Sequence, residues 1–498
     1  MYVKELVVQN IKGYRESSCF RFSPSLNYIV GNNNCGKSTV FEAVMFIAGA
    51  KYDPSSLFSK EADGPSRVEL TLAGTDLADR VAGPKFVKLK DYLHTDVDGD
   101  TVLRVERSTE ARQVDQGGRA PASLDVKKLC FWHPERAQFE NPTGIDALFK
   151  ALIEFEPVWA NVDPSDTADL GTTKVLGRLL SAVTKPFYET AVWKSFADAH
   201  GAAFGDDEGS LADLTRQVAG ELGELVRSQY GEASARFDFA MPDAAAFIKA
   251  GVVQVDDGGI ETPLGDKGTG MQRAFALAII QLWAKYSSQI DDDEKPLVLL
   301  VDEPETWLHP AAQQRLAGAL AEIAQRQQIF VITHSPYLLW CFGGDRHQLV
   351  VLESRGSGGR VLHSSDLGGL SGPYPSLGEI THRAFGICTE GFHNELYGIV
   401  AAHLSDRETN PEAGEKAIDD FLVERGLTHE LTWKRANGRS FARTLPVYIR
   451  NTIHHPENGD NAPFTQVQLA ESTAELLRVI GEIRVGSGRV AAEPEPVA

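Results

Sequence analysis

The sequence predicts a mixed α/β fold with additional helical parts, and three observations support this prediction. Apolar segments without charges, at 297–301 and 329–333, are typical of strands buried inside a parallel sheet. Segments that alternate with period two, at 2–10 and 67–72, predict an antiparallel β layer beside that sheet. A stretch rich in Ala, Leu and Glu at 144–230 predicts helices. With 498 residues, the chain is expected to form two to four domains.

Composition and charge narrow the class of protein. Hydrophobic residues make up 42% of the chain and charged residues 24%, without an apolar run near 18 residues, so we expect no membrane span. The first residues lack the pattern of a signal peptide, and five scattered cysteines without a C-x-x-C pair fit a reducing cytoplasm. The net charge of −20 gives no general attraction to nucleic acid, so such contact would need a local basic patch.

The motif G-x-x-x-x-G-K-[ST] occurs at 31–38, after a short apolar segment and before a helical one. Glycines in such a loop let backbone N–H groups curl around phosphate oxygens, and the following helix adds donors at its N-terminus. Lys37 is expected to reach the β- and γ-phosphates of ATP, and the Ser38 hydroxyl to ligate Mg²⁺. The residues expected to bind nucleotide are Gly31, Asn32, Asn33, Asn34, Cys35, Gly36, Lys37, Ser38 and Thr39.

Two carboxylates follow the apolar segment 297–301. Asp302 is expected to hold Mg²⁺ through water, and Glu303 to orient the attacking water as general base. Lys37 and Asp302 lie 265 positions apart, which is far more than in compact NTPases with a single core. A long helical insertion therefore separates the two halves of the expected site.

This order of segments resembles the ABC-type ATPases of the SMC, RecF and OLD kind. The resembling segments are 1–50 and 260–352, together with the strands between them. The resemblance implies that Gly268 and Gly270 belong to a degenerate signature loop, which caps the ATP bound to an opposite head. It also implies that His334 is the switch histidine that donates to the γ-phosphate. ATP would then drive pairing of two heads, giving a homodimer or a larger even-numbered assembly.

The C-terminal part differs from the Toprim nuclease domain that ends OLD proteins, because no Asp-x-Asp follows the Glu390-Gly391 segment. A helix ending in R-N-x-x-H-H-P instead resembles a HEPN domain, a helical family that includes metal-independent ribonucleases. The resemblance implies that Arg450 stabilises the phosphate transition state, that His455 transfers the proton and that Asn451 positions them. His454 shares a helical face with Arg450, so the choice of histidine depends on where the helix ends.

The predicted architecture is an α/β P-loop ABC-type ATPase head, a mixed sheet with a flanking antiparallel β layer, followed by an all-α domain. The expected boundaries are 1–143 and 231–365 for the two lobes of the head, 144–230 for a helical insertion, 377–485 for the HEPN-like domain and 486–498 for a disordered tail.

Three functions compete. In the first, an ATPase controls its own C-terminal ribonuclease in a bacterial defence or toxin-like system, acting on RNA. In the second, the chain is an ATPase sensor whose effector nuclease is a separate protein. In the third, it is a DNA-repair head of the RecF kind, which the acidic charge disfavours.

Overall fold

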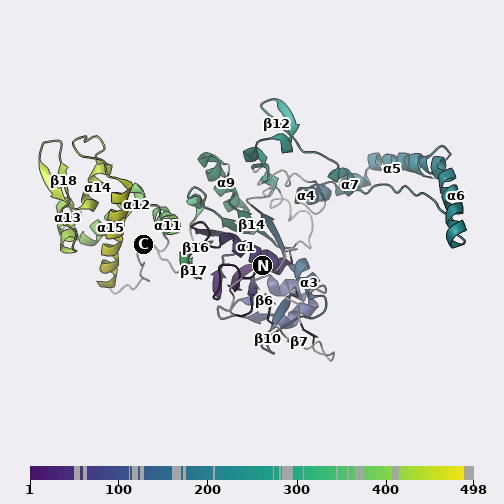
Figure 1. Ribbon diagram of the computed structural model, residues 1–498, viewed down its shortest axis with the longest axis horizontal. Helices are drawn as coiled ribbons and strands as arrows, with labels where there is room; N and C mark the ends of the chain where they lie inside the picture. Colours follow the sequence, from purple (N-terminus) through teal and green to yellow (C-terminus); the bar gives the residue numbers. More distant parts are fainter. Residues whose placement is uncertain are drawn as a thin grey trace. The chain divides into compact units, whose positions relative to one another are not determined.

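The computed structural model describes residues 1–49, 56–59, 64–110, 113–114, 122–123, 128–159, 170–171, 175–205, 208–272, 274–276, 278–279, 282, 295–306, 308–343, 346–355, 358–364, 370, 375–405 and 414–486. The chain divides into two compact units. One comprises residues 1–160 and 295–498, and the other residues 161–294. Figure 1 shows the whole chain coloured along the sequence.

The first unit is built on a six-stranded sheet with the order β11-β14-β15-β3-β16-β17. Its first five strands are parallel, and only β17 pairs antiparallel, with β16. The central strands are buried throughout because they lack polar side chains at almost every position. The strands are β11 (Glu154–Val158), β14 (Leu297–Asp302), β15 (Gln328–Ile332), β3 (Leu26–Gly31), β16 (His347–Arg355) and β17 (Gly358–His363).

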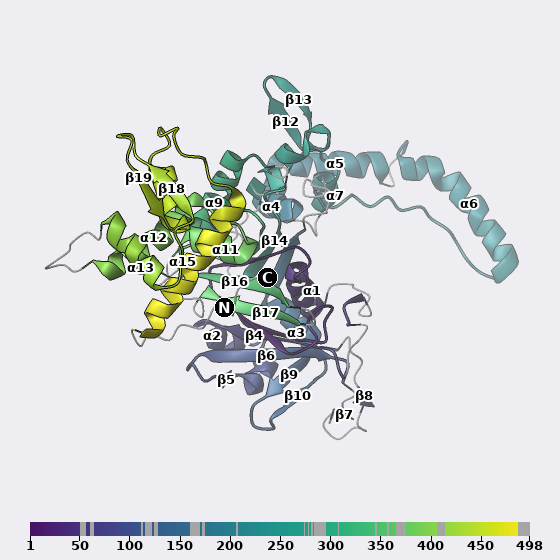
Figure 2. The same cartoon turned by 60° about the vertical axis from the view of Figure 1, so that its left-hand side comes forward.

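A second, antiparallel sheet has the order β10-β9-β6-β4-β1-β2, with the short β5 on β6. This confirms the predicted antiparallel layer. One hydrophobic core joins both sheets and helix α1 (Lys37–Ala48), which packs between them (Figure 2). The strands are β10 (Gln138–Glu140), β9 (Cys130–His133), β6 (Thr101–Ser108), β4 (Arg67–Ala73), β1 (Tyr2–Gln9), β2 (Ser18–Arg21) and β5 (His94–Thr95).

The remaining elements of this part are short, apart from one helix after β14. They are α2 (Leu77–Ala82), η2 (Val87–Tyr92), the pair β7 (Gln113–Val114) and β8 (Ala122–Ser123), α3 (Ile145–Leu152), α9 (Pro310–Ile323) and η6 (Leu338–Cys341). The structure differs here from the helical region expected from residue 144, because β11 pairs with β14. Pro157 is tolerated in β11 because this strand lies at the edge of the sheet.

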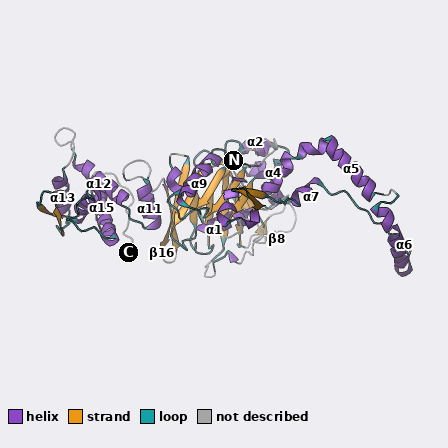
Figure 3. Cartoon of the chain, turned by 90° about the horizontal axis from the view of Figure 1, so that it is seen from above, coloured by secondary structure: helices purple, strands orange, loops and turns teal. Residues whose placement is uncertain are grey.

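The second unit consists mainly of helices (Figure 3). Side chains of Thr190 and Ser210 cap the two longest, α5 and α6, by accepting backbone N–H groups of the first turn. A further helix begins at residue 269, after η5. The elements are α4 (Val175–Val183), η4 (Lys185–Glu189), α5 (Ala191–Phe204), α6 (Leu211–Tyr230), α7 (Ala244–Lys249), the hairpin β12 (Gln254–Asp257) and β13 (Ile260–Pro263), and η5 (Leu264–Asp266).

The C-terminal part is helical but not all-α, because the short hairpin β18–β19 precedes α14. Trp433, a residue with high strand propensity, is buried in this hairpin and fixes it against Tyr448. The expected tail at 486–498 falls, apart from its first residue, outside the described residues. The elements are α11 (Leu377–Phe385), α12 (Glu390–Leu404), α13 (Glu415–Glu424), β18 (Leu431–Lys434), β19 (Ser440–Arg443), α14 (Leu445–His454) and α15 (Gln466–Gly486).

Candidate functional site

The phosphate-binding loop joins the end of β3 to the start of α1. Gly31, Asn34 and Gly36 have positive φ angles of 151°, 62° and 96°. At Gly36 a Cβ atom would lie 2.8 Å from the hydroxyl of Tyr14, so only glycine fits both the backbone angle and the space. A loop that turns its backbone N–H groups inward at a helix N-terminus is a built anion site.

Lys37 lies inside this loop. Its ammonium group donates to the carbonyl oxygens of Gly31 at 3.0 Å and Asn32 at 2.7 Å. Burial lowers the pKa of Lys37, and the carboxylates of Glu303 and Asp302 act in the opposite direction. Lys37 therefore interacts electrostatically with Asp302 and Glu303, which lie 265 and 266 positions further along the chain.

The parallel sheet brings these residues together. Strand β15 pairs with both β3 and β14, with Ile332 opposite Ile29 on one side and Asp302 on the other. Since the carboxyl ends of parallel strands meet at one edge, the loop after β3 and the carboxylates after β14 share that edge. Asp302 is 7% exposed there. Ser38 and Asp302 offer hydroxyl and carboxylate oxygens, the ligands that Mg²⁺ prefers, so the site fits this ion.

Glu303 and His334 face each other across the same edge. The backbone N–H of Glu303 donates to Ile332 at 2.9 Å, and its φ of 43° is unusual for a residue other than glycine. His334 Nε2 lies 3.5 Å from Glu303 Oε1. Burial and the charge of Lys37 lower the pKa of His334, while Glu303 raises it. Burial of His334 therefore favours its neutral form, in which one ring nitrogen can donate.

Glu305 holds this histidine in place, although the sequence analysis assigned it no role. Its Oε1 accepts from the backbone N–H of His334 at 2.7 Å and from Thr333 Oγ1 at 2.8 Å. Burial raises the pKa of Glu305, and these donors act against it. A sequence signal existed, since Glu305 follows Glu303 by two residues and comes directly after Pro304.

The signature-like loop belongs to the second unit, whereas the phosphate-binding loop belongs to the first. Gly268 accepts backbone N–H groups of Met271 and Gln272, which starts the helix there. The buried Gln272 side chain donates to the carbonyl oxygens of Gly265 and Lys267, both at 2.9 Å, and so fixes the loop. A role of Gly268 and Gly270 at ATP stays a prediction.

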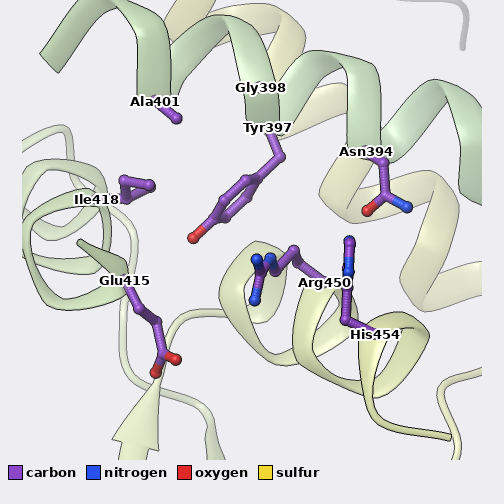
Figure 4. Close-up of a pocket in the computed structure, with 8 residues that line it drawn as sticks. All are labelled: Asn394, Tyr397, Gly398, Ala401, Glu415, Ile418, Arg450 and His454. Carbon is purple, nitrogen blue, oxygen red and sulfur yellow. The ribbon is translucent and has the colours of Figure 1, made fainter. Parts of the chain in front are cut away.

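A separate pocket of about 310 Å³ lies in the C-terminal part (Figure 4). Arg450 and His454 enter it from α14, and Tyr397 and Asn394 from α12. The Arg450 guanidinium lies 5.7 Å from the centre of the Tyr397 ring and donates to Asn451 Oδ1 at 3.2 Å. Burial raises the pKa of Tyr397 to about 12. The pocket thus holds a positioned cation beside a histidine.

His455 does not line this pocket. Helix α14 ends at His454, and His455 leaves the helical conformation with a φ of −127°. Its Nδ1 lies 3.4 Å from Glu457, and its side chain is half exposed. Residues four apart share a helical face, so Arg450 and His454 line the pocket together. The catalytic roles of Arg450 and His455 stay predictions. Asn451 is buried and its Oδ1 accepts from the Arg450 guanidinium, and its role as a positioning residue stays a prediction.

Within the described part of the chain, no cluster of three or more His, Cys, Asp or Glu residues has the arrangement of a protein metal centre. None of the helices described is long and apolar enough to cross a membrane.

The loop after β3 and the carboxylates after β14 have the arrangement of a P-loop ATPase site. Comparison with known families agrees. Residues 5–126 match a model described as AAA domain, and residues 193–339 match one described as AAA ATPase domain. The two matches contain the phosphate-binding loop, the Asp302–Glu303 pair and His334.

Individual relatives point to the same class. The chain is 26% identical to an OLD nuclease from Thermus scotoductus over 172 residues, which is 32% of this chain and 30% of the relative. It is 37% identical to structural maintenance of chromosomes protein 3 from Saccharomyces cerevisiae over 65 residues, 13% of this chain and 5% of the relative. The chain thus spans less than a third of the curated relatives it matches. The family matches support ATPase domains in this chain.

Among solved structures, the SMC head bound to the C-winged helix domain of ScpA is similar with a TM-score of 0.44 and 16% identity, covering 73% of this chain and 97% of that one. The SMC head domain from Thermotoga maritima gives a TM-score of 0.33 and 13% identity, covering 73% of this chain and 98% of that one.

Proposed function

We propose that the chain binds ATP with Mg²⁺ at the loop 31–39 and hydrolyses it. The observation that carries this proposal is the meeting of Lys37, Asp302, Glu303 and His334 at one edge of the parallel sheet. Lys37 binds the terminal phosphates, and Glu303 orients water and accepts its proton. His334, held by Glu305, donates to the γ-phosphate. Ser38 and Asp302 would hold Mg²⁺, which when bound would neutralise charge on the phosphates.

Two heads are proposed to pair on ATP, with Gly268 and Gly270 of one copy capping the nucleotide of the other. The resemblance to SMC and OLD proteins supports this, together with the helix that begins directly after Gly268. Hydrolysis would open the pair and so change the state of an effector. The proposed setting is the bacterial cytoplasm, in a defence or toxin-like system.

The effector is proposed to be the C-terminal part, acting as a ribonuclease. His454 takes the proton of an RNA 2′-hydroxyl, whose oxygen attacks the adjacent phosphorus. The bond from phosphorus to the 5′-oxygen breaks, giving a 2′,3′-cyclic phosphate and a 5′-hydroxyl end after protonation. Arg450 stabilises the charge that develops on the phosphate oxygens. Arg450 and His454 in one pocket support this role.

A basic hairpin next to α14 also supports RNA as the substrate. Lys434, Arg435 and Arg439 are exposed on β18–β19 and the turn between them. The side-chain amide groups of Asn458 and Asn461 donate to the carbonyl oxygen of Lys434, which ties the loop after α14 to this hairpin. A phosphate backbone is attracted to such a patch even on an acidic chain.

A cleavage assay on total RNA and plasmid DNA, with and without ATP and with EDTA, tests the assignment. RNA cleavage that persists in EDTA and leaves cyclic-phosphate ends supports the ribonuclease. ATP hydrolysis without cleavage, together with a co-purifying nuclease, supports the alternative sensor subunit. ATP-dependent binding to DNA ends or gaps supports the RecF-like alternative.

A further inference from the structure

Five tyrosines are buried in the part of the chain that the structure describes, and Tyr397 on α12 differs from the others. It is only 7% exposed, yet no described residue forms a hydrogen bond with its hydroxyl group. A buried hydroxyl without a partner costs free energy, which a phenylalanine would avoid. The hydroxyl of Tyr397 therefore points to a ligand rather than to packing. The other four hydroxyls donate to protein oxygens: Tyr14 to Gly36, Tyr28 to Leu338, Tyr92 to Glu140 and Tyr448 to Ala462.

The hydroxyl end of Tyr397 faces the C-terminal pocket. The ring itself belongs to the apolar core of this part of the chain, together with Leu396, Val447 and Leu476. Figure 4 shows the hydroxyl extending from this core into the space between α12 and α14. The core therefore fixes the direction of the ring and, with it, the place of the hydroxyl beside a bound ligand.

The Arg450 guanidinium lies between this hydroxyl and His454 (Figure 4). Its central carbon is 5.7 Å from the centre of the Tyr397 ring, and His454 follows one helical turn later on the same face of α14. A phosphate bound to Arg450 would have the imidazole on one side and the phenol on the other. In-line displacement at phosphorus needs such an arrangement, because the attacking and leaving oxygens lie on opposite sides.

The two flanking groups also differ in their affinity for protons. Partial burial lowers the pKa of His454, and the charges of Arg450 and His455 act in the same direction, which favours a neutral ring that can accept a proton. Burial raises the pKa of Tyr397 to about 12, although the charge of Arg450 acts against this, so the phenol keeps its proton near neutral pH. Neighbouring groups whose pKa values are pushed apart are typical of an acid and base pair.

The other polar groups of the pocket are less suited to give a proton. Glu415 is the one carboxylate among the described residues that line it, and it accepts from Arg443 Nε at 2.7 Å. A carboxylate in this role is an acceptor without a proton to give. Asn394 carries an amide, which does not act as an acid. Tyr397 therefore remains as the proton donor opposite His454.

We propose that Tyr397 protonates the 5′-oxygen that leaves when RNA is cleaved in this pocket. This role rests on the ribonuclease proposed above, which names no group for that step. His454 takes the proton of the 2′-hydroxyl, whose oxygen bonds to phosphorus, and the bond to the 5′-oxygen breaks as that oxygen takes the proton of Tyr397. The phenolate that results lies beside the Arg450 cation. Return of a proton from His454 to Tyr397 through water restores both groups, so no further reactant is consumed.

Replacement of the leaving oxygen by sulfur tests the proposal, because a thiolate leaves without being protonated. Oligoribonucleotides with the linkage that the unchanged full chain cleaves are made with a 5′-oxygen or a 5′-sulfur at that position. Tyr397→Phe is expected to lower kcat on the oxygen substrate by about 10²-fold and on the sulfur substrate by less than about threefold, with little change in KM. Tyr448→Phe is the matched control, since it removes a buried hydroxyl outside the pocket and should affect both substrates alike.

His454→Ala separates the two proton transfers. It should lose cleavage of both substrates, because the 2′-hydroxyl must give up its proton in either case. ATP hydrolysis and thermal unfolding that match the unchanged chain show that Tyr397→Phe is folded.

Three results would overturn the proposal. Equal losses of Tyr397→Phe on both substrates would mean that the phenol does not protonate the leaving group, while the ribonuclease itself would stand. Rescue of His454→Ala by sulfur, without rescue of Tyr397→Phe, would exchange the two roles. Absence of RNA cleavage by the unchanged chain, or cleavage that His454→Ala leaves intact, would overturn the proposed ribonuclease and the role of Tyr397 with it.

Discussion

The ATP site and the C-terminal pocket are assembled in different ways. The first collects residues from the ends of three parallel strands that are distant in sequence, and the sheet register fixes their positions. The second depends on two helices, α12 and α14, and on the residue at which α14 ends. The order of the parallel strands therefore fixes where motifs after buried strands lie. At a helix end, by contrast, a shift of the last helical residue by one position changes which side chain faces the pocket.

The largest expected effect is a loss of ATP hydrolysis at the ATP site. Glu303→Gln should reduce ATP hydrolysis by about 10²–10⁴-fold, because the side chain keeps its size but no longer accepts a proton. Phosphate release measures hydrolysis, and a fluorescent ATP analogue measures binding, which should persist. Glu322→Gln on α9 is the charge-matched control. Equal hydrolysis by both variants would remove Glu303 from the mechanism.

Core packing under the ATP site gives the next effect. Leu300→Ala in β14 should lower the free energy of unfolding by about 2–5 kcal/mol, because the fully buried side chain leaves a cavity. Val87→Ala, at a position that is 57% exposed, should change it by less than about 0.5 kcal/mol. Urea unfolding of both variants measures the difference, and similar values would contradict the buried position of β14.

The helix-built pocket is tested by Arg450→Ala, which should reduce RNA cleavage by about 10²-fold while ATP hydrolysis stays unchanged. The two neighbouring histidines sharpen the comparison. His454→Ala should lose cleavage, and His455→Ala should retain most of it, because only His454 lines the pocket. If His455→Ala alone abolishes cleavage, the helix end in solution differs from the one described.

The smallest effect concerns pH and the core beside this pocket. His393 is buried, with Nε2 2.8 Å from Ser472 Oγ, and burial lowers its pKa to about 4. As pH falls, the unfolded chain binds a proton at His393 before the folded chain does. The resulting loss in the free energy of unfolding is absent above pH 7 and grows as pH falls from about 6.5 toward 4. At pH 5.5 this loss should reach about 1 kcal/mol.

Hydrogen exchange of α12 and α15 at pH 7 and 5.5 checks this effect. After correction for the intrinsic dependence of exchange on pH, protection should fall in the unchanged chain. It should fall less in His393→Gln, which retains a hydrogen-bonding group but does not titrate in this range. An equal fall in both would assign the loss to other groups.

Much of the nucleotide site followed from the sequence because its residues sit at fixed offsets from buried strands. The phosphate-binding loop that holds Lys37, and the residues Asp302 and His334, follow apolar runs, and parallel strands end at one edge. Glu305 was missed as a support for His334, because its role depends on the backbone N–H of a residue on another strand. Such contacts form only in the folded chain and leave no periodic pattern in the amino-acid sequence.

The C-terminal part was less predictable for two physical reasons. The hairpin β18–β19 is only four residues per strand, too short for a clear alternating pattern, and Trp433 is stabilised by packing on Tyr448. The end of α14 was uncertain because both His454 and His455 precede the proline that cannot continue a helix. β11 was assigned to a helical region because its pairing with β14 is tertiary.

The most direct test of the central claim, that the loop after β3 and the carboxylates after β14 form one site, is the effect of Mg²⁺ on ATP affinity. In the unchanged chain, Mg²⁺ should tighten binding of ATP, and Asp302→Asn should lose most of that gain while binding ATP in EDTA as before. An undiminished gain from Mg²⁺ in Asp302→Asn would show that Asp302 does not share the site of the phosphate-binding loop, and the account would fail.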